Sequence, residues 1–294
     1  MTDYELLDFG NGRKLERFGD VVLDRVSPPA EGTSRALPQD VWSKADARFL
    51  RTQGLKGQWQ CRRELPEAWG ISWGEFSLEL KRTDVGHLGV FPEQAENWRW
   101  IFQQTRDWLQ TGRPFRVLNL FAYTGGSTLA AASAMFQAGK TSENREQFSV
   151  AHVDSARNVV QWARRNAEIS GLTTAPIRWI AEDARLFVQR ELKRGRSYEA
   201  VILDPPSYGH GTKGEMWKLD AHLPELLDQC GQLLADEAAF VLLTLHSPGT
   251  TPKMLSQMLR RYFPQLSHTS TQPMELKTSQ GRTLQSGMAA RAWG

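Results

Sequence analysis

From Arg116 onward, short apolar segments alternate with longer amphipathic segments, and this alternation is the feature that most limits how the chain can fold. The apolar runs are nearly continuous, which is typical of strands buried on both faces of a parallel sheet. Strands that alternate with helices build an α/β fold with helices on both faces. We therefore predict a doubly wound, mostly parallel sheet. The expected strands are 116–121, 149–154, 176–181, 199–204 and 238–246, and the expected helices are 127–138, 156–170, 184–194, 219–234 and 252–263.

The two ends of the chain follow other patterns. Segments 268–277 and 283–293 have no helix between them, so we expect an antiparallel C-terminal strand pair beside the parallel sheet. Near the start, alternating runs at 4–10 and 14–26 flank the turn Gly10-Asn11-Gly12, as in a hairpin. Helical spacing begins after Pro92. We predict a small β-rich N-terminal domain over 1–92, a candidate substrate reader, then a linking helix over 93–112 and a Rossmann-like domain over 113–294.

Composition excludes several classes of protein. No apolar run approaches the ~18 residues of a membrane helix, and the first residues do not resemble a secretion signal. The two cysteines, Cys61 and Cys230, form no disulfide framework, and the six histidines show no metal-ligand spacing. We expect a cytoplasmic protein with no membrane partner and no metal. The oligomeric state is left open, with a homodimer as one alternative.

The formal net charge of +3 does not by itself indicate nucleic acid. Residues 1–114 carry a net −1 and residues 115–294 a net +4. Basic residues gather at 157–165 and 185–196. We interpret these clusters as solvated helix faces in preference to a phosphate-binding patch.

Ligands of open α/β sheets sit beyond the carboxyl ends of the strands, so the residues that follow each strand are the candidate site. The first strand runs into a turn whose paired glycines let a ligand approach bare backbone. Three later strands each deliver a carboxylate to the same edge, more than helix capping alone requires. The candidates are Phe121, Tyr123, Thr124 and Gly125 in the turn, and the carboxylates Asp154, Asp183 and Asp204.

These carboxylates suit an adenosine cofactor without a pyrophosphate. Asp154 can accept from two ribose hydroxyls, and Asp183 can accept from an adenine amino group. A sulfonium methyl donor favours an acidic pocket, which predicts S-adenosylmethionine. The literal GxGxxG of Gly209–Gly214 does not open a helix directly from a strand, so we expect a mobile active-site loop there and no nicotinamide site.

The motifs LNLFAYTGG, VDSA, EDA and DPPSYG, preceded by GHLGVFPEQ, resemble the bacterial 23S ribosomal RNA base methyltransferases of the class I fold. That family makes 5-methylcytosine or 7-methylguanine, and the likeness runs from Gly86 to the last residue. It implies ribosomal RNA as partner. It also implies that Phe121, Tyr123 and Gly125 line the cofactor, Asp154 holds the ribose, Asp183 the adenine, Asp204 faces the methyl group, and Gln94 reaches the methionine end.

Two departures separate this chain from the family's pattern. Residues 1–85 show no evident PUA-type RNA-binding module. The segment Thr244-Leu245-His246-Ser247-Pro248 also lacks the cysteine that cytosine C5 enzymes use as nucleophile. Attack by a base nitrogen needs no such nucleophile.

The expected reacting edge is Asp204 with the Pro205 carbonyl, which would hold an N–H group, while Tyr208 supports a base. His246 is either a proton acceptor or a hydrogen-bonded structural histidine. Two alternatives to an RNA substrate stay open. One is methyl transfer to a protein or small molecule, and the other is a non-catalytic binding subunit.

Overall fold

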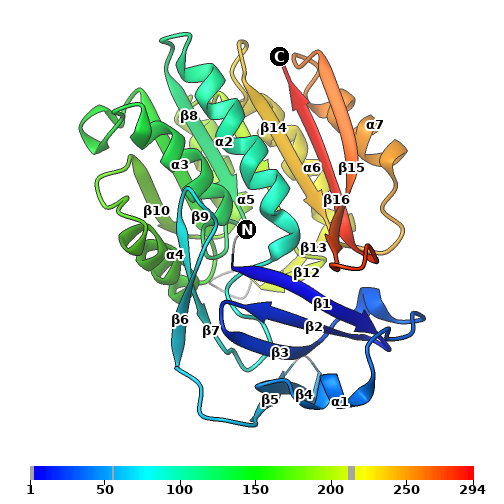
Figure 1. The fold of residues 1–294 in the computed structure, drawn as a ribbon. Helices are drawn as coiled ribbons and strands as arrows, with labels where there is room; N and C mark the ends of the chain where they lie inside the picture. Colours follow the sequence, from blue (N-terminus) through cyan, green and yellow to red (C-terminus); the bar gives the residue numbers. More distant parts are fainter. Residues whose placement is uncertain (1–2, 55, 211–215) are drawn as a thin grey trace. The chain divides into compact units, whose positions relative to one another are not determined.

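The computed structural model describes residues 3–54, 56–210 and 216–294 (Figure 1). The chain divides into two compact units. The first comprises Met1–Ala95 and Met274–Ser286, and the second comprises Glu96–Pro273 and Gly287–Gly294.

A seven-stranded sheet forms the centre of the second unit, in the order β10-β9-β8-β11-β14-β16-β15. The first five strands in this order are parallel, and β16 runs antiparallel to β14, which confirms the predicted fold class. β8 and β11 are buried along almost their whole length because helices cover both faces. The strands are β8 (Phe115–Leu120), β9 (Phe148–Asp154), β10 (Ile177–Ala181), β11 (Ala200–Leu203), β14 (Phe240–Leu245), β15 (His268–Lys277) and β16 (Thr283–Trp293).

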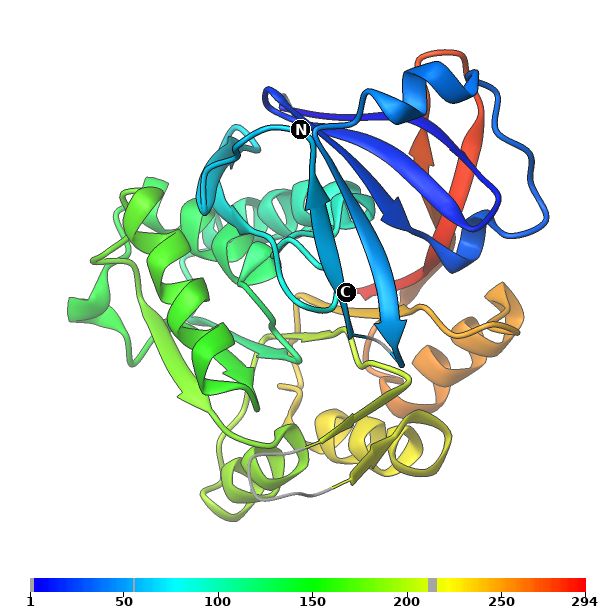
Figure 2. The same ribbon diagram turned by 90° about the horizontal axis from the view of Figure 1, so that it is seen from below.

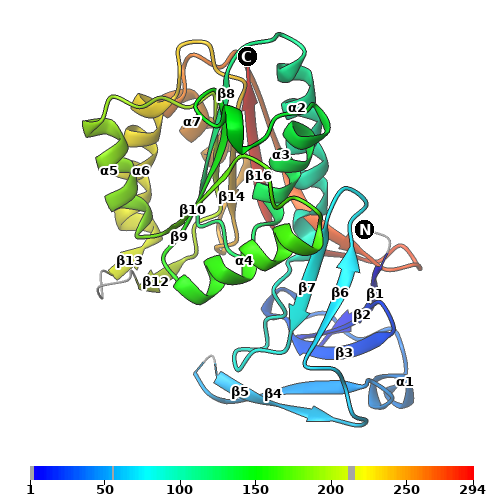
Figure 3. The same cartoon turned by 90° about the vertical axis from the view of Figure 1, so that its left-hand side faces the viewer.

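Helices lie on both faces of this sheet, as Figure 3 shows with α3 on one side and α5 and α6 on the other. The expected helices form within three residues of their predicted ends, and the 3-10 turn Pro92–Gln94 precedes the first of them. The helices are α2 (Ala95–Leu109), α3 (Gly126–Gln137), α4 (Arg157–Ile169), α5 (Ala184–Lys193), α6 (Leu219–Leu233) and α7 (Pro252–Tyr262). In the described ranges, none of the helices has the length and apolar character that a membrane span requires.

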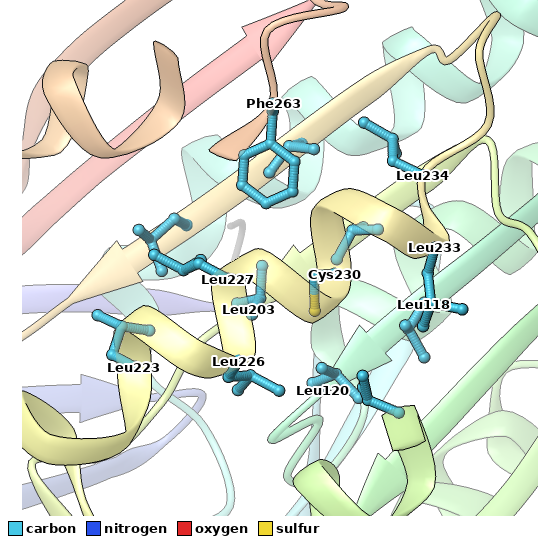
Figure 4. Close-up of a cluster of buried hydrophobic side chains, with 14 of the residues drawn as sticks. Leu118, Leu120, Leu203, Leu223, Leu226, Leu227, Cys230, Leu233, Leu234 and Phe263 are labelled. Carbon is cyan, nitrogen blue, oxygen red and sulfur yellow. The ribbon is translucent and has the colours of Figure 1, made fainter. Parts of the chain in front are cut away.

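Cys230 lies in the apolar core between α6 and the sheet (Figure 4). Its side chain is fully buried among leucines such as Leu118, Leu203 and Leu226. Burial raises the pKa of the thiol far above its usual range. The cysteine is therefore a packing residue, as its place in a helical apolar run indicated.

The connections of the sheet define where a ligand can bind. The chain runs from β8 outward to β9 and β10, and then crosses back to β11 on the other side of β8. The topological switch point therefore lies between β8 and β11. The loops beyond the carboxyl ends of these two strands line the crevice that such a switch creates.

The first unit contains a five-stranded sheet in the order β1-β2-β3-β4-β5 and a separate β6–β7 pair. The Gly10-Asn11-Gly12 turn joins β1 to β2 as predicted. The run expected over 14–26 is instead broken at Gly19, whose φ of +60° reverses the chain between β2 and β3. The elements are β1 (Tyr4–Gly10), β2 (Arg13–Phe18), β3 (Val21–Val26), the short helix α1 (Gln39–Ser43), β4 (Ala47–Gln53), β5 (Lys56–Cys61), β6 (Ala68–Ser72) and β7 (Ser77–Lys81).

The β15–β16 hairpin extends from the second unit into the first, and its tip lies beside β1 (Figure 2). Leu276 and Leu284 from the tip pack in one apolar cluster with Leu6 and Phe9. The guanidinium of Arg282 also pairs with the buried carboxylate of Asp8. The hairpin tip thus completes a core of the first unit.

Candidate functional site

The predicted site residues follow four strands of the second unit at the carboxyl edge of the sheet. The turn 121–125 follows β8, Asp154 ends β9, Asp183 follows β10, and Asp204 follows β11. Because neighbouring parallel strands end at the same edge, the fold places these residues along one edge. Gln94 belongs to the first unit, where it is buried in the 3-10 turn before α2.

The turn after β8 has an unusual backbone. Phe121 and Tyr123 have φ of +56° and +49°, and Gly125 has φ of +96°. Non-glycine residues rarely adopt this region, and each one costs about 1–3 kcal/mol unless its surroundings enforce it. Such enforced strain is typical of ligand-binding turns.

Tight packing holds this turn in place. A Cβ on Gly126 would lie only 2.5 Å from Cζ2 of Trp98, so the helix N-terminus approaches the tryptophan ring more closely than a side chain allows. On the other side, the buried amide of Asn166 donates to the Thr124 carbonyl at 2.8 Å. The backbone is therefore already shaped before any ligand arrives.

A buried polar chain lies below the turn. The amide of Asn119 donates to Oγ1 of Thr128 at 2.8 Å, and that hydroxyl lies 2.9 Å from Nδ1 of His152. Since Thr128 accepts from the amide, we assign its own hydrogen to the bond with Nδ1, which leaves the ring proton on Nε2. Burial lowers the pKa of His152 to about 3, so the ring is neutral at pH 7. Sequence reasoning missed these hydrogen-bonded side chains, although Asn119 and His152 are polar residues within otherwise apolar strands.

Asp154 links the end of β9 to the turn. Its Oδ2 accepts from the Tyr123 N–H and its Oδ1 from the Ala156 N–H, both at 2.9 Å. Burial raises the pKa of this carboxyl group, while the two backbone donors oppose that rise. Each oxygen keeps a second lone pair, so the fixed carboxylate can still accept from two vicinal hydroxyls.

Asp183 has a capping role in addition to any ligand role. Its Oδ1 accepts from the N–H groups of Arg185 and Leu186 at 2.9 and 3.2 Å, which caps α5. Both capping bonds use the same oxygen, so the cap orients Oδ2 as the atom that can meet a ligand.

Asp204 is held by the neighbouring strand. Its Oδ1 accepts from Oγ1 of Thr244 at 2.5 Å and lies 3.1 Å from Nε2 of His246. About a third of each of the Asp204 and His246 side chains is exposed to solvent. The structure therefore joins His246 to the carboxylate, a contact that sequence reasoning had not assigned.

The segment after Asp204 forms a small hairpin, β12 (Tyr208–His210) with β13 (Met216–Lys218). The Pro206 carbonyl accepts from Nε1 of Trp217 at 2.6 Å. The centroid of the Trp217 ring lies 4.9 Å from the centroid of the Phe121 ring. Tyr208 is half exposed. Sequence reasoning missed Trp217, which connects the Asp204 segment to the turn. Residues 211–215, most of the expected glycine-rich loop, lie outside the described residues.

The chemistry of this edge fits an adenosine cofactor with a sulfonium group. The site offers a fixed carboxylate that can accept from two ribose hydroxyls and a second carboxylate for an amino group. A third carboxylate, that of Asp204, stands at the switch point. Acidic groups stabilise a cationic methyl donor and would repel a pyrophosphate. Among the described residues, no group of histidine, cysteine and carboxylate side chains is arranged to hold a metal ion.

Comparison with known proteins agrees with this chemistry. The family model described as S-adenosylmethionine-dependent methyltransferase matches residues 42–271. A solved S-adenosylmethionine-dependent methyltransferase from Agrobacterium tumefaciens is 34% identical, with a TM-score of 0.88 over 99% of this chain and 90% of that one.

Two curated relatives carry more specific names. Ribosomal RNA large subunit methyltransferase I of Aeromonas hydrophila is 29% identical over 84% of this chain and 60% of its own length. Ribosomal RNA large subunit methyltransferase K of Neisseria meningitidis serogroup B is 28% identical over 44% of this chain and 33% of its own length. The chain thus spans a third to three fifths of these relatives.

The family match covers most of the chain, the solved relative aligns along almost all of it, and the acidic strand ends suit the same cofactor. The chain therefore belongs to the S-adenosylmethionine-dependent methyltransferases, and S-adenosylmethionine is its cofactor.

Proposed function

We propose that this enzyme methylates a nitrogen atom of a base in RNA, with large-subunit ribosomal RNA as the substrate. The names of the two curated relatives support the choice of RNA. The observation that carries the choice of nitrogen is the Asp204 carboxylate, which Thr244 and His246 hold in place. These two residues belong to the segment in which the cytosine C5 enzymes of the resembled family have their cysteine nucleophile.

Within this proposal, the turn residues Phe121, Tyr123, Thr124 and Gly125 line the cofactor. Asp154 accepts from the ribose hydroxyls, Asp183 accepts from the adenine amino group through Oδ2, and Gln94 reaches the methionine end. The positive φ values of the turn support this assignment, because backbone strain that the surroundings enforce is typical of ligand-binding sites. When bound, S-adenosylmethionine supplies a methyl group on a positively charged sulfur.

Asp204 and the Pro205 carbonyl form the acceptor pair for the N–H group of the base. Two successive prolines fix the backbone after Asp204. In the part of the chain that the structure describes, no donor bonds the Pro205 carbonyl, so that oxygen can accept from a substrate. The Asp204 carboxylate would take up the proton that the base nitrogen loses when it is methylated, while the carbon–sulfur bond of the donor would break and leave a neutral thioether. His246 stabilises the arrangement by sharing Oδ1.

Tyr208 provides a ring against which the planar base rests. Half of its side chain is exposed at the segment that follows Asp204. A base that stacks on an aromatic ring gains about 1–3 kcal/mol. The tyrosine therefore acts on substrate affinity, whereas Asp204 acts on turnover.

Mass spectrometry of nucleosides from ribosomal RNA of cells with and without the gene tests this function. We expect one N-methylated base to disappear with the gene and to return when the purified enzyme and S-adenosylmethionine are added to the unmodified RNA. An identical set of modified nucleosides in both cells would favour the protein or small-molecule substrate instead. An RNA substrate and the two unpaired cysteines also support a cytoplasmic location.

A further inference from the structure

A cavity opens at the edge of the methyltransferase sheet opposite to the candidate cofactor site. It has a volume of about 490 Å³. Its walls come from the amino ends of β8 and β10, from the start of β9 and the segment before it, and from the end of α5 and the segment between α5 and β11. Four arginines line it: Arg116, Arg145, Arg178 and Arg196. Glu146 and Glu191 also line it, which leaves a surplus of two positive charges.

Glu191 belongs to the internal structure of this cavity. It is almost fully buried, accepts from the Tyr198 hydroxyl at 2.6 Å and from the Arg194 guanidinium at 2.9 Å. The Arg178 guanidinium lies 3.8 Å from the same carboxylate. Arg116 also has a partner within the protein, because its guanidinium forms an ion pair with Glu199 at 2.6 Å. These contacts build a rigid wall that a ligand does not have to order.

Arg145 and Arg196 differ from the other two arginines. Both are exposed, and in the described part of the chain neither guanidinium has an ion-pair partner. The hydroxyl-bearing residues Ser149 and Ser197 also line the cavity. Guanidinium forks with nearby hydroxyls match the oxygens of a phosphate group.

We propose that this cavity binds a backbone phosphate of the RNA substrate, an inference that rests on the proposed function. It departs from the interpretation of the 185–196 cluster as a solvated helix face, because Arg196 lies after the end of α5 and lines the cavity. β8 has six residues, so the cavity lies about 20 Å from the reacting edge, a span of a few nucleotides. β10 is the outer strand of the sheet and connects the two edges, with Arg178 near its start and Asp183 soon after its end. RNA that follows this strand reaches both sites.

The test is a pair of double variants of the full chain. Arg145→Gln with Arg196→Gln removes the two unpaired guanidinium groups of the cavity. Arg260→Gln with Arg261→Gln removes the same charge from exposed positions on α7 and is the matched control. The probe is large-subunit ribosomal RNA from cells that lack the gene, assayed for methyl transfer and for binding between 50 and 200 mM salt.

We expect the cavity variant to raise KM for this RNA about tenfold, with kcat and S-adenosylmethionine affinity unchanged. The slope of log Kd against log salt should fall by about 0.7 for each lost contact. The control variant should have a KM and a salt slope near those of the wild type. Equal KM values and salt slopes for wild type and cavity variant would overturn the inference while the proposed function stands.

A titration with inorganic phosphate distinguishes a site for the phosphate groups of the RNA backbone from a site for free phosphate. If phosphate binds the wild type and not the cavity variant, while both bind RNA equally, the cavity is a small-anion site and the RNA assignment is wrong. If the wild type methylates no RNA at all, the proposed function fails first, and the RNA assignment fails with it.

Discussion

The hydroxyl of Thr244 donates to Oδ1 of Asp204 across neighbouring strands at 2.5 Å, and His246 reaches the same oxygen at 3.1 Å. The donors sit on β14 or directly after it, and the acceptor directly follows β11. Since these strands pair in register, the sheet itself sets the direction of the carboxyl group. A group held in this way keeps its orientation even if the following loop moves.

Asp204→Asn should cut turnover about 100-fold or more while leaving the melting temperature nearly unchanged. The amide oxygen can replace Oδ1 in the contacts to Thr244 and His246, but the amide nitrogen then presents a donor to the substrate N–H, which loses its acceptor. Single-turnover methyl transfer measures the effect. Thr244→Ser retains the hydroxyl and is the control, with activity near wild type. Normal turnover by Asp204→Asn would reduce this residue to a strand terminator.

Tyr208→Ala should weaken RNA binding by about 1–3 kcal/mol with little change in kcat, because the ring supports the base and takes no part in proton transfer. The measurement is KM and kcat for the ribosomal RNA substrate. Tyr208→Phe keeps the ring and should behave like wild type. A Phe variant as defective as the Ala variant would assign the effect to the hydroxyl and contradict stacking.

Asp154→Ala should weaken S-adenosylmethionine binding by about 1.5–3 kcal/mol, the value of hydrogen bonds to a charged acceptor. The variant also frees the Tyr123 N–H, so the turn loses one of its restraints. Calorimetry with S-adenosylmethionine and with NADH makes the comparison, and we expect no NADH binding by either protein. NADH binding by the wild type, or full affinity in the variant, would refute the cofactor geometry.

Cys61→Ser and Cys230→Ala should each retain methyl transfer. Cys61 is exposed in β5, and Cys230 is packed among leucines under α6, so neither thiol stands at the reacting edge. Cys230→Ala removes a buried sulfur and should lower the melting temperature without changing kcat. Loss of activity in a folded Cys230 variant that binds cofactor would restore a cysteine-based C5 mechanism.

His152 should make the protein less stable as the pH falls below about 6.5. The unfolded chain takes up a proton near that pH, whereas the pKa of about 3 keeps the buried ring neutral in the folded state. Between these values the unfolded state binds more protons, so stability is lost by up to about 1.4 kcal/mol per pH unit. Urea unfolding at several pH values measures the slope, and His152→Gln should flatten it. An NMR titration that shows the ring protonating near pH 6 would contradict this assignment.

The apolar alternation predicted the second unit well because burial on both faces leaves a strong signal in each strand. The carboxylates at the strand ends were recognisable for a related reason: Asp154 and Asp204 mark where an apolar strand stops. The positive φ values of Phe121 and Tyr123 were not predictable, because neither residue type favours that region. They arise from restraints such as the bond from the Tyr123 N–H to Asp154, which is distant in sequence.

Other features depended on contacts that no local pattern contains. Trp217 reads as one more apolar residue near a glycine-rich loop, and its role appears only when its ring meets Phe121. Asp183 was interpreted mainly as a ligand residue, and its capping of α5 shows that the same carboxylate serves both structure and site. Arg145 and Arg196 are far apart in the chain and converge only because their segments end at one edge of the sheet.

The path of the β15–β16 hairpin has a consequence for how this architecture can be rearranged. The chain passes between the two units at Ala95, again at Pro273 and again at Ser286. A single recombination breakpoint near residue 95 would therefore not transfer the first unit intact, because Leu276 and Leu284 would stay behind and meet a foreign surface. Exchanging the first unit between relatives requires a matching hairpin, so the two parts are constrained to evolve together.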